Sequence, residues 1–293
     1  IPPLLEAHFG VPMSGAILNA INIRLEAATI AYILAHSEAK ILISDRQFSD
    51  VVERAIELTE IPPTVIDIDD VREGDLLGVT TYEDLLREGD PLYRGKDVAD
   101  EWGAISLNYT SGTTGEPKGV VYHHRGAYLN ALANITAWDM PRHPNYLWTL
   151  PMFHCNGWCF PWTIVAQAGT QVCLRNVQPD KVWRALRNEK ITHLCGAPII
   201  LSLLIDLGKA ISEGKTPEVN IMTAASPPPP AVLAAAEELG FKVTHAYGLT
   251  ECYGPGVVCA WKEEWDALPG PEKALLKARQ GVRYPSLAGL MVA

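Results

Sequence analysis

Two hydrophobic patterns alternate along most of the chain. Short runs rich in Ile, Val and Leu are typical of buried strands, and longer amphipathic runs are typical of helices. The predicted strands are residues 16–18, 40–44, 64–68, 104–109, 120–122, 146–150, 171–174, 192–195, 219–223 and 242–246. The predicted helices are residues 25–37, 125–137, 158–166, 179–188, 198–207 and 230–239, with a surface helical excursion over 261–280. Pro161 should kink the third of these helices.

The order of these elements predicts an α/β fold. Repeated strand–helix alternation favours two largely parallel sheets flanked by helices. A composition break at 140–144 suggests a first lobe over 1–140 and a second lobe over 141–253. The pattern weakens after Gly254, so 254–293 is expected to begin a third, truncated subdomain. The abrupt first residue, Ile1, leads us to expect that the chain is a fragment.

Composition and charge exclude several classes of protein. Of the 293 residues, 48% are hydrophobic and 20% are charged, which excludes an intrinsically disordered chain. The net charge of −10 argues against nucleic acid as a partner. No run approaches the roughly 20 apolar residues of a transmembrane segment. The six cysteines are expected to be reduced thiols, which favours a cytoplasmic location.

The densest chemical signal is the loop that follows the strand at 104–109. Residues 110–119 carry three glycines, four hydroxyls and Lys118. Glycines let backbone N–H groups approach an anion, and a lysine adds a charge suited to phosphate. Pro117 and Gly119 flank the lysine, so the loop is not the standard phosphate loop, in which a helix follows directly. A polar surface turn is the alternative, but a turn does not need four hydroxyls and a lysine.

Several motifs together resemble a known family. Residues 109–119 resemble the signature loop of the adenylate-forming (AMP-binding) superfamily, and 150–154 and 247–251 resemble its next two motifs. Residues 154–158 and 245–248 are most similar to the acyl-CoA synthetase branch, which includes plant acyl-activating enzymes and bacterial medium- or short-chain acyl-CoA ligases. The resemblance covers essentially the whole chain.

The resemblance implies a two-step reaction. ATP and a short- or medium-chain fatty or aromatic carboxylic acid give acyl-AMP and pyrophosphate, and CoA then displaces AMP. Mg²⁺ is the implied metal. The small C-terminal domain of full-length relatives, with its catalytic lysine, and the aspartate that binds ribose would follow Ala293. Two alternatives stay open: a nucleotide-binding fragment without turnover, and an adenylation domain that loads a carrier protein. A homodimer also stays open.

The resemblance also implies roles for individual residues. Thr250 would contact the α-phosphate and Glu251 would bind Mg²⁺, although both could instead begin a helix as N-cap and first-turn acid. The residues expected at the β- and γ-phosphates are Thr110, Ser111, Gly112, Thr113, Thr114, Gly115 and Lys118.

The remaining implied positions line the adenine and acyl sites. The adenine-contacting residues would be Ala224, Ala225, Ser226, Pro227, His245, Ala246, Tyr247 and Gly248, with Tyr247 stacked on the base. The acyl-site residues would be His154, Asn156, Gly157, Trp158 and Ala246. A small-residue junction between strand and loop is the alternative for 224–227. Core packing is the preferred interpretation of Phe160 and Trp162.

Overall fold

The computed structural model describes residues 1–110, 115–210 and 218–291. It divides into two compact units, and each is described by itself. We call them the N-terminal unit (Pro3–Ala99 and Ala104–Val121) and the larger unit (Ile1–Pro2, Asp100–Gly103 and Tyr122–Ala293).

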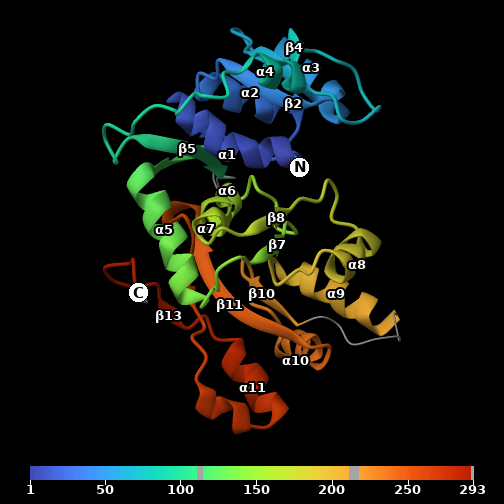
Figure 1. Cartoon of the computed structure of the whole chain (residues 1–293), viewed down its shortest axis with the longest axis vertical. Coiled ribbons are helices and arrows are strands. Elements are labelled where there is room, and N and C mark those ends of the chain that lie inside the picture. Colours follow the sequence, from blue (N-terminus) through green and yellow to red (C-terminus); the bar gives the residue numbers. More distant parts are fainter. Residues whose placement is uncertain (111–114, 211–217, 292–293) are drawn as a thin grey trace. The chain divides into compact units, whose positions relative to one another are not determined.

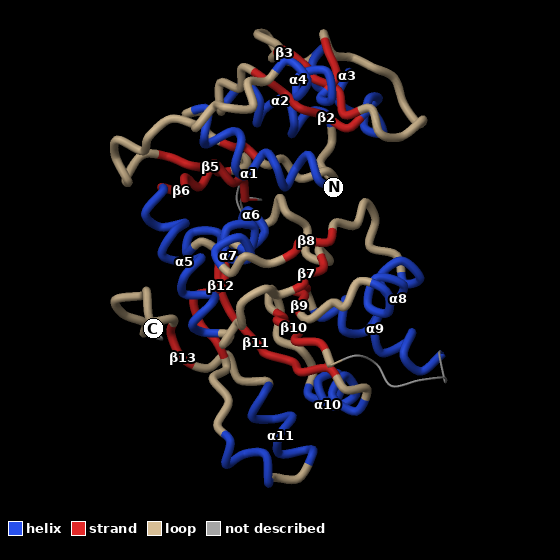
Figure 2. The backbone as a smooth tube through the Cα atoms, viewed as in Figure 1, coloured by secondary structure: helices blue, strands red, loops and turns tan. Residues whose placement is uncertain are grey.

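The N-terminal unit contains two small sheets (Figures 1 and 2). In the first, β1 (Leu18–Asn19) pairs in parallel with β5 (Ala104–Thr110), and β6 (Lys118–His123) lies next to β5. In the second, β2 (Ile41–Asp45), β3 (Thr64–Ile68) and β4 (Thr80–Thr81) are all parallel. Its helices are α1 (Pro2–Ser14), α2 (Ala27–His36), α3 (Ser49–Glu57) and α4 (Tyr82–Glu88).

The core of the N-terminal unit follows from the spacing of apolar residues on α2. Ile30, Ala31 and Leu34 share one face of a helix because they are one, three or four positions apart. They pack against Ala55 of α3 and are nearly inaccessible to solvent. Leu42 of β2 packs against the same cluster, so the second sheet is joined to its helices by apolar burial.

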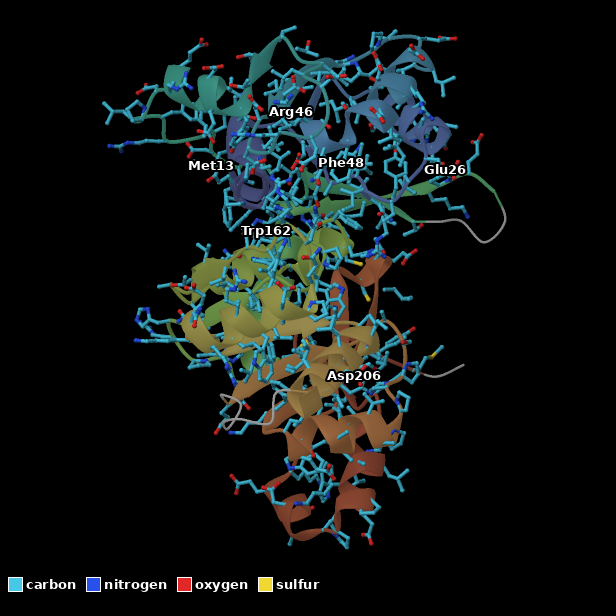
Figure 3. The ribbon with its side chains drawn as sticks, turned by 90° about the vertical axis from the view of Figure 1, so that its right-hand side faces the viewer. Met13, Glu26, Arg46, Phe48, Trp162 and Asp206 are labelled. Carbon is cyan, nitrogen blue, oxygen red and sulfur yellow. The ribbon has the colours of Figure 1, made fainter. Side chains whose placement is uncertain are left out.

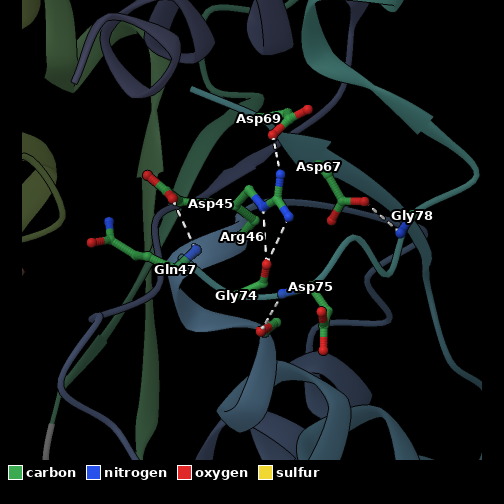
Figure 4. A network of polar contacts seen from close by, with 9 residues as sticks. Asp45, Arg46, Gln47, Asp67, Asp69, Gly74, Asp75 and Gly78 are labelled. Atoms are coloured by element: carbon green, nitrogen blue, oxygen red, sulfur yellow. Dashed lines mark hydrogen bonds and ion pairs between the residues drawn. The ribbon is translucent and has the colours of Figure 1, made fainter. Parts of the chain in front are cut away.

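A polar network closes the end of this second sheet (Figure 4). The guanidinium of Arg46 donates to the Gly74 carbonyl through Nε (3.1 Å) and Nη2 (2.7 Å) and pairs with Asp69. Gly74 has a φ of +82°, and a Cβ there would lie 1.9 Å from the Arg46 carbonyl oxygen. The turn can therefore approach Arg46 only because residue 74 is a glycine.

The larger unit is built on a seven-stranded sheet in the order β13-β12-β11-β10-β9-β7-β8 (Figure 2). Neighbouring strands are parallel from β8 through β7, β9 and β10 to β11. The pairs β11–β12 and β12–β13 are antiparallel. The strands are β7 (Asn145–Leu147), β8 (Thr170–Val172), β9 (His193–Gly196), β10 (Val219–Thr223), β11 (Phe241–Leu249), β12 (Gly254–Val258) and β13 (Val282–Arg283).

Helices cover both faces of this sheet. Ile221 of β10 belongs to a buried apolar cluster with Leu201 of α9 and Leu233 of α10. The next residue, Met222, points the other way, and its Sδ lies 4.0 Å from the Tyr284 hydroxyl, which in turn donates to Asn134 of α5. The helices are α5 (His124–Ala137), α6 (Cys155–Trp158), α7 (Phe160–Ala166), α8 (Pro179–Asn188), α9 (Pro198–Ala210), α10 (Pro230–Glu238) and α11 (Gly270–Lys277).

Side chains fill the space between these elements (Figure 3). Phe160 is fully buried and stacks on Tyr146 with ring centroids 5.4 Å apart. It also meets Trp138 edge to face, with ring centroids 5.6 Å apart. This confirms the preferred interpretation of Phe160 as a core residue. Trp162, labelled in Figure 3, lies on α7 and is half-buried.

The α/β class and the parallel pairing of the main strands are confirmed. The described residues form three sheets, whereas two were expected. The expected helix at 158–166 is two segments, α6 and α7, which meet at Cys159 with a left-handed backbone. Helices α1, α3 and α4 were not anticipated. The division into 1–140, 141–253 and 254–293 stays a prediction.

Candidate functional site

The predicted phosphate loop joins two neighbouring strands of the N-terminal unit. β5 ends at Thr110, which is half-buried, and β6 begins at Lys118, which is exposed. Gly115 is also exposed, and a Cβ there would meet no atom within 4 Å. The other expected phosphate-binding residues, Ser111, Gly112, Thr113 and Thr114, lie outside the described residues.

Side chains of α2 contact both flanks of this loop. The His36 Nδ1 lies 2.7 Å from the Tyr109 hydroxyl, and the two rings meet edge to face. Tyr32 is stacked on His36, and desolvation together with the Glu116 carboxylate raises the pKa of Tyr32. Helix α2 therefore contacts the residue before the loop, and one of its side chains is influenced by Glu116 within the loop. Sequence reasoning missed both α2 residues, because neither belongs to a recognisable motif.

In the larger unit, Tyr122 contacts the turn that carries Thr250 and Glu251. This turn is a 3₁₀ helix (Thr250–Cys252). The Tyr122 hydroxyl donates to the Thr250 carbonyl at 2.8 Å, and Tyr122 stacks on Tyr253 with ring centroids 4.1 Å apart. The side chain of Glu251 is exposed. Leu249, not Thr250, is the N-cap residue, so the interpretation of Thr250 as a cap is wrong.

A left-handed turn precedes the helix α7. Cys155, Asn156, Gly157, Trp158 and Cys159 all have positive φ, between +40° and +64°. For residues other than glycine this conformation costs roughly 1–2 kcal/mol each. Strain of this kind persists only where the surrounding structure fixes it, and it is frequent at functional sites.

The surroundings of the left-handed turn fix it from two sides. The Asn134 amide of α5 donates to the Trp158 carbonyl at 3.0 Å, and the Cys159 thiol donates to the Tyr253 carbonyl at 3.5 Å. A Cβ at Gly254 would lie 2.9 Å from the Trp158 Cα, so β12 approaches the turn closely. The turn is thus packed against the segment that follows Glu251.

The predicted acyl and α-phosphate motifs meet at one contact. The Cys155 Sγ lies 3.2 Å from the Thr250 Oγ1. His154, which immediately precedes the turn, is exposed. Of the other expected acyl-site residues, Asn156, Gly157 and Trp158 are buried in the turn and Ala246 is buried on β11.

The two segments expected at adenine lie at the same edge of the sheet. Thr223, the last residue of β10, pairs in parallel with His245 of β11. Carboxyl ends of parallel strands meet at one edge, so 224–227 and 245–248 are neighbours. Within the first segment, Ala224 is buried, whereas Ala225, Ser226 and Pro227 are exposed.

Two details at this edge bear on the expected adenine slot. Ala225 adopts a φ of +78°, a conformation that favours glycine. Tyr247 is 39% exposed, so its ring has a face available for stacking, while a Cβ at Gly248 would collide with the Gly254 carbonyl. The His245 imidazole is buried, and its Nδ1 lies 3.0 Å from the Ala278 carbonyl oxygen. Burial lowers the pKa of His245.

The described side chains could bind a metal ion only if a bound substrate supplied further ligands. Among the described residues, no group of three or more His, Cys, Asp or Glu side chains could hold a metal ion. Glu251 offers one exposed carboxylate. Mg²⁺ fits such a position because it takes one or two carboxylates and completes its shell with water and substrate phosphates. No helix in the described part of the chain is both long and apolar enough to span a bilayer.

Comparison with known proteins gives consistent matches. The profile of the AMP-binding enzyme family matches residues 1–285. The chain is 47% identical to an acetate/butyrate–CoA ligase of Arabidopsis thaliana, AAE7, named as peroxisomal, and 46% identical to an acetate–CoA ligase of Humulus lupulus, CCL3. Each match covers 100% of this chain and 54% of the relative, so the chain spans about half the length of these curated relatives.

The fold also matches solved structures. The inhibitor-bound N-terminal domain of FACL13 from Mycobacterium tuberculosis superposes with a TM-score of 0.76 at 25% identity, over 86% of this chain and 61% of that domain's chain. The α/β arrangement described above is therefore shared with that N-terminal domain.

Proposed function

We propose, from the premise that this chain belongs to the AMP-binding enzyme family, that the protein containing it is an ATP-dependent carboxylate–CoA ligase. In the proposed reaction a carboxylate attacks the α-phosphorus of ATP, releasing pyrophosphate, and CoA thiol then displaces AMP from the acyl-adenylate. The match over residues 1–285 is the observation that carries this proposal.

In the first step, this chain is proposed to stabilise the negative charge on the phosphates of ATP. Joining an anion to a polyanion requires positive groups and hydrogen-bond donors at the transferring phosphoryl group. Lys118 and the loop backbone would hold the terminal phosphates, and the Thr250 hydroxyl would donate to the α-phosphate. Glu251 would hold Mg²⁺, which would neutralise charge on the phosphate oxygens.

The adenine base would lie at the carboxyl ends of β10 and β11. The exposed ring of Tyr247 supports a stacking role there, and the small residues Ala224 and Ala225 leave room for a flat base. His154 and the left-handed turn at 155–159 would border the acyl group.

We place the substrate among short- and medium-chain fatty acids and aromatic acids. The acetate and butyrate in the names of the two relatives favour the short-chain end. The location stays a prediction: cysteine usage favours the cytoplasm, whereas one relative is named as peroxisomal.

The test is pyrophosphate release by the longest protein that contains this chain. Acetate, butyrate, octanoate and benzoate are supplied with ATP and Mg²⁺, and thioester formation is then followed after addition of CoA. We expect pyrophosphate with at least one short acid and CoA-dependent thioester with the same acid. Lys118→Ala should lose most of both signals. Binding of MgATP without pyrophosphate from any acid would contradict the ligase assignment.

A further inference from the structure

Thr250 is held by two groups that are distant in sequence. The Tyr122 hydroxyl donates to its carbonyl oxygen at 2.8 Å, which fixes the main chain. The Cys155 Sγ lies 3.2 Å from its Oγ1, which engages the side chain. No role was predicted for Cys155, which is one of the six cysteines expected to be reduced thiols. Its contact with Thr250 gives it a more specific position.

Either atom of this contact can be the donor, and the protonation state of the Cys155 thiol determines whether the sulfur is able to donate. Cys155 is only partly accessible to solvent, and burial is the largest influence on its thiol and raises the pKa. The thiol therefore stays protonated at neutral pH. A neutral S–H can donate to the Thr250 oxygen, which leaves the hydroxyl proton free for an anionic acceptor. A thiolate would instead capture that proton.

The left-handed turn explains why the thiol reaches Thr250. A φ of +44° at Cys155 directs its Cβ differently from a right-handed helical residue. The turn cannot relax easily, because Asn134 holds the Trp158 carbonyl and Cys159 holds the Tyr253 carbonyl. The same turn therefore contacts the Thr250–Tyr253 segment at both of its ends.

We propose that Cys155 is a positioning residue, whose thiol orients the Thr250 hydroxyl so that its proton points to an anionic ligand. This inference rests on the proposed function, which gives Thr250 a contact with the α-phosphate. The strained turn at 155–159 then fixes the position of one hydrogen-bond donor, the Cys155 thiol. The same turn would also border the acyl group.

The first experiment measures the orientation of Thr250 without any ligand. Three-bond couplings to the Thr250 methyl carbon report its χ1 rotamer, and Thr250→Val identifies the signal. We expect one rotamer in the unsubstituted chain, rotamer averaging in Cys155→Ala, and a single rotamer again in Cys155→Ser, which keeps a donor. Cys259→Ala is the matched control, because its thiol donates to the Leu276 carbonyl and not to Thr250. Couplings that are unchanged in Cys155→Ala would overturn the proposal.

The second experiment measures MgATP affinity by calorimetry in a double-mutant cycle. Cys155→Ala should weaken binding about fivefold to tenfold, the scale of one hydrogen bond, with near-normal affinity in Cys155→Ser and Cys259→Ala. In the Thr250→Val background, Cys155→Ala should have no further effect, because its route through the hydroxyl is gone. An equal loss in both backgrounds, or no loss in either, would show that the thiol does not act through Thr250.

These measurements separate the two proposals. Absence of MgATP binding by the unsubstituted chain would contradict the proposed function, and the rotamer couplings would still decide whether Cys155 orients Thr250. Rotamer averaging with undiminished MgATP affinity would refute the link between orientation and binding while leaving the ligase assignment intact.

Discussion

At the scale of single residues, Gly74 is a position where backbone geometry strongly disfavours any side chain. Its φ of +82° and the 1.9 Å approach of a Cβ to the Arg46 carbonyl both oppose a side chain. Gly74→Ala should destabilise the N-terminal unit by about 2–3 kcal/mol, through left-handed strain and loss of the Arg46 contacts. Hydrogen exchange of β2 and β3 amides measures the change. Gly10→Ala, in open space on α1, should be neutral or slightly stabilising, and equal effects would refute the argument.

A second residue-scale prediction concerns Glu251. In Glu251→Gln the amide can no longer supply the negative charge that Mg²⁺ prefers, so MgATP affinity should fall about tenfold or more while the urea midpoint stays unchanged. Calorimetry with Mg²⁺, and with EDTA in its place, distinguishes a lost metal contact from a general loss. Glu272→Gln alters an equally exposed carboxylate at the start of α11 and should bind normally. Equal affinity in both variants would remove Glu251 from the metal site.

The family motifs were recognisable in the sequence, but the backbone handedness of residues 155–159 was not. The predicted helix began at residue 158, whereas the structure gives five consecutive residues with positive φ, 155–159. Two of them, Asn156 and Gly157, are residue types that adopt this conformation readily. The turn is imposed by tertiary contacts from Asn134 and Tyr253, which are invisible in a local pattern.

At the scale of elements, Asn134 of α5 links the left-handed turn at 155–159 to Tyr284. Its amide donates to the Trp158 carbonyl and to the Thr163 hydroxyl, and its carbonyl oxygen accepts from Tyr284. Asn134→Ala would leave buried polar groups without partners and should cost about 2–4 kcal/mol of unfolding free energy. Urea titration followed by tryptophan fluorescence measures it. Thr136→Ala, an exposed position on the same helix, should change stability by less than about 0.5 kcal/mol.

Strands were easier to predict than helices in this chain. The runs at 219–223 and 242–246 are short and contain β-branched residues, which favour strands, and they lie within β10 and β11. Helix α1 was missed because its sequence holds Pro2, Pro3 and Pro12 and lacks a clear polar face. Its boundaries depend on packing that a local pattern does not encode. The pairing of β10 with β11, which brings the two expected adenine segments together, followed from the general rule for parallel sheets.

At the scale of the whole molecule, the tryptophans divide unevenly between the two units. All eight lie in the larger unit, at residues 102, 138, 148, 158, 162, 183, 261 and 265. Tryptophan fluorescence therefore follows unfolding of that unit alone. It is a suitable probe for buried histidines there, since Trp138 meets His193 edge to face at 5.0 Å.

The stability of the larger unit should fall in acid because of His193. Burial lowers the pKa of His193 to about 4, against about 6.5 for an unfolded histidine. A depressed folded pKa means that the unfolded state takes up the proton first. The stabilisation is thus complete above about pH 6.5 and is lost as the pH falls towards 4, by up to about 3 kcal/mol. In His193→Gln this loss should be absent, so the difference in urea midpoint between the two proteins should shrink steadily over that range. Carboxylates titrate equally in both proteins and cancel in the comparison. Curves that stay parallel from pH 7 to pH 4 would mean that His193 is protonated in the folded chain as readily as in the unfolded one.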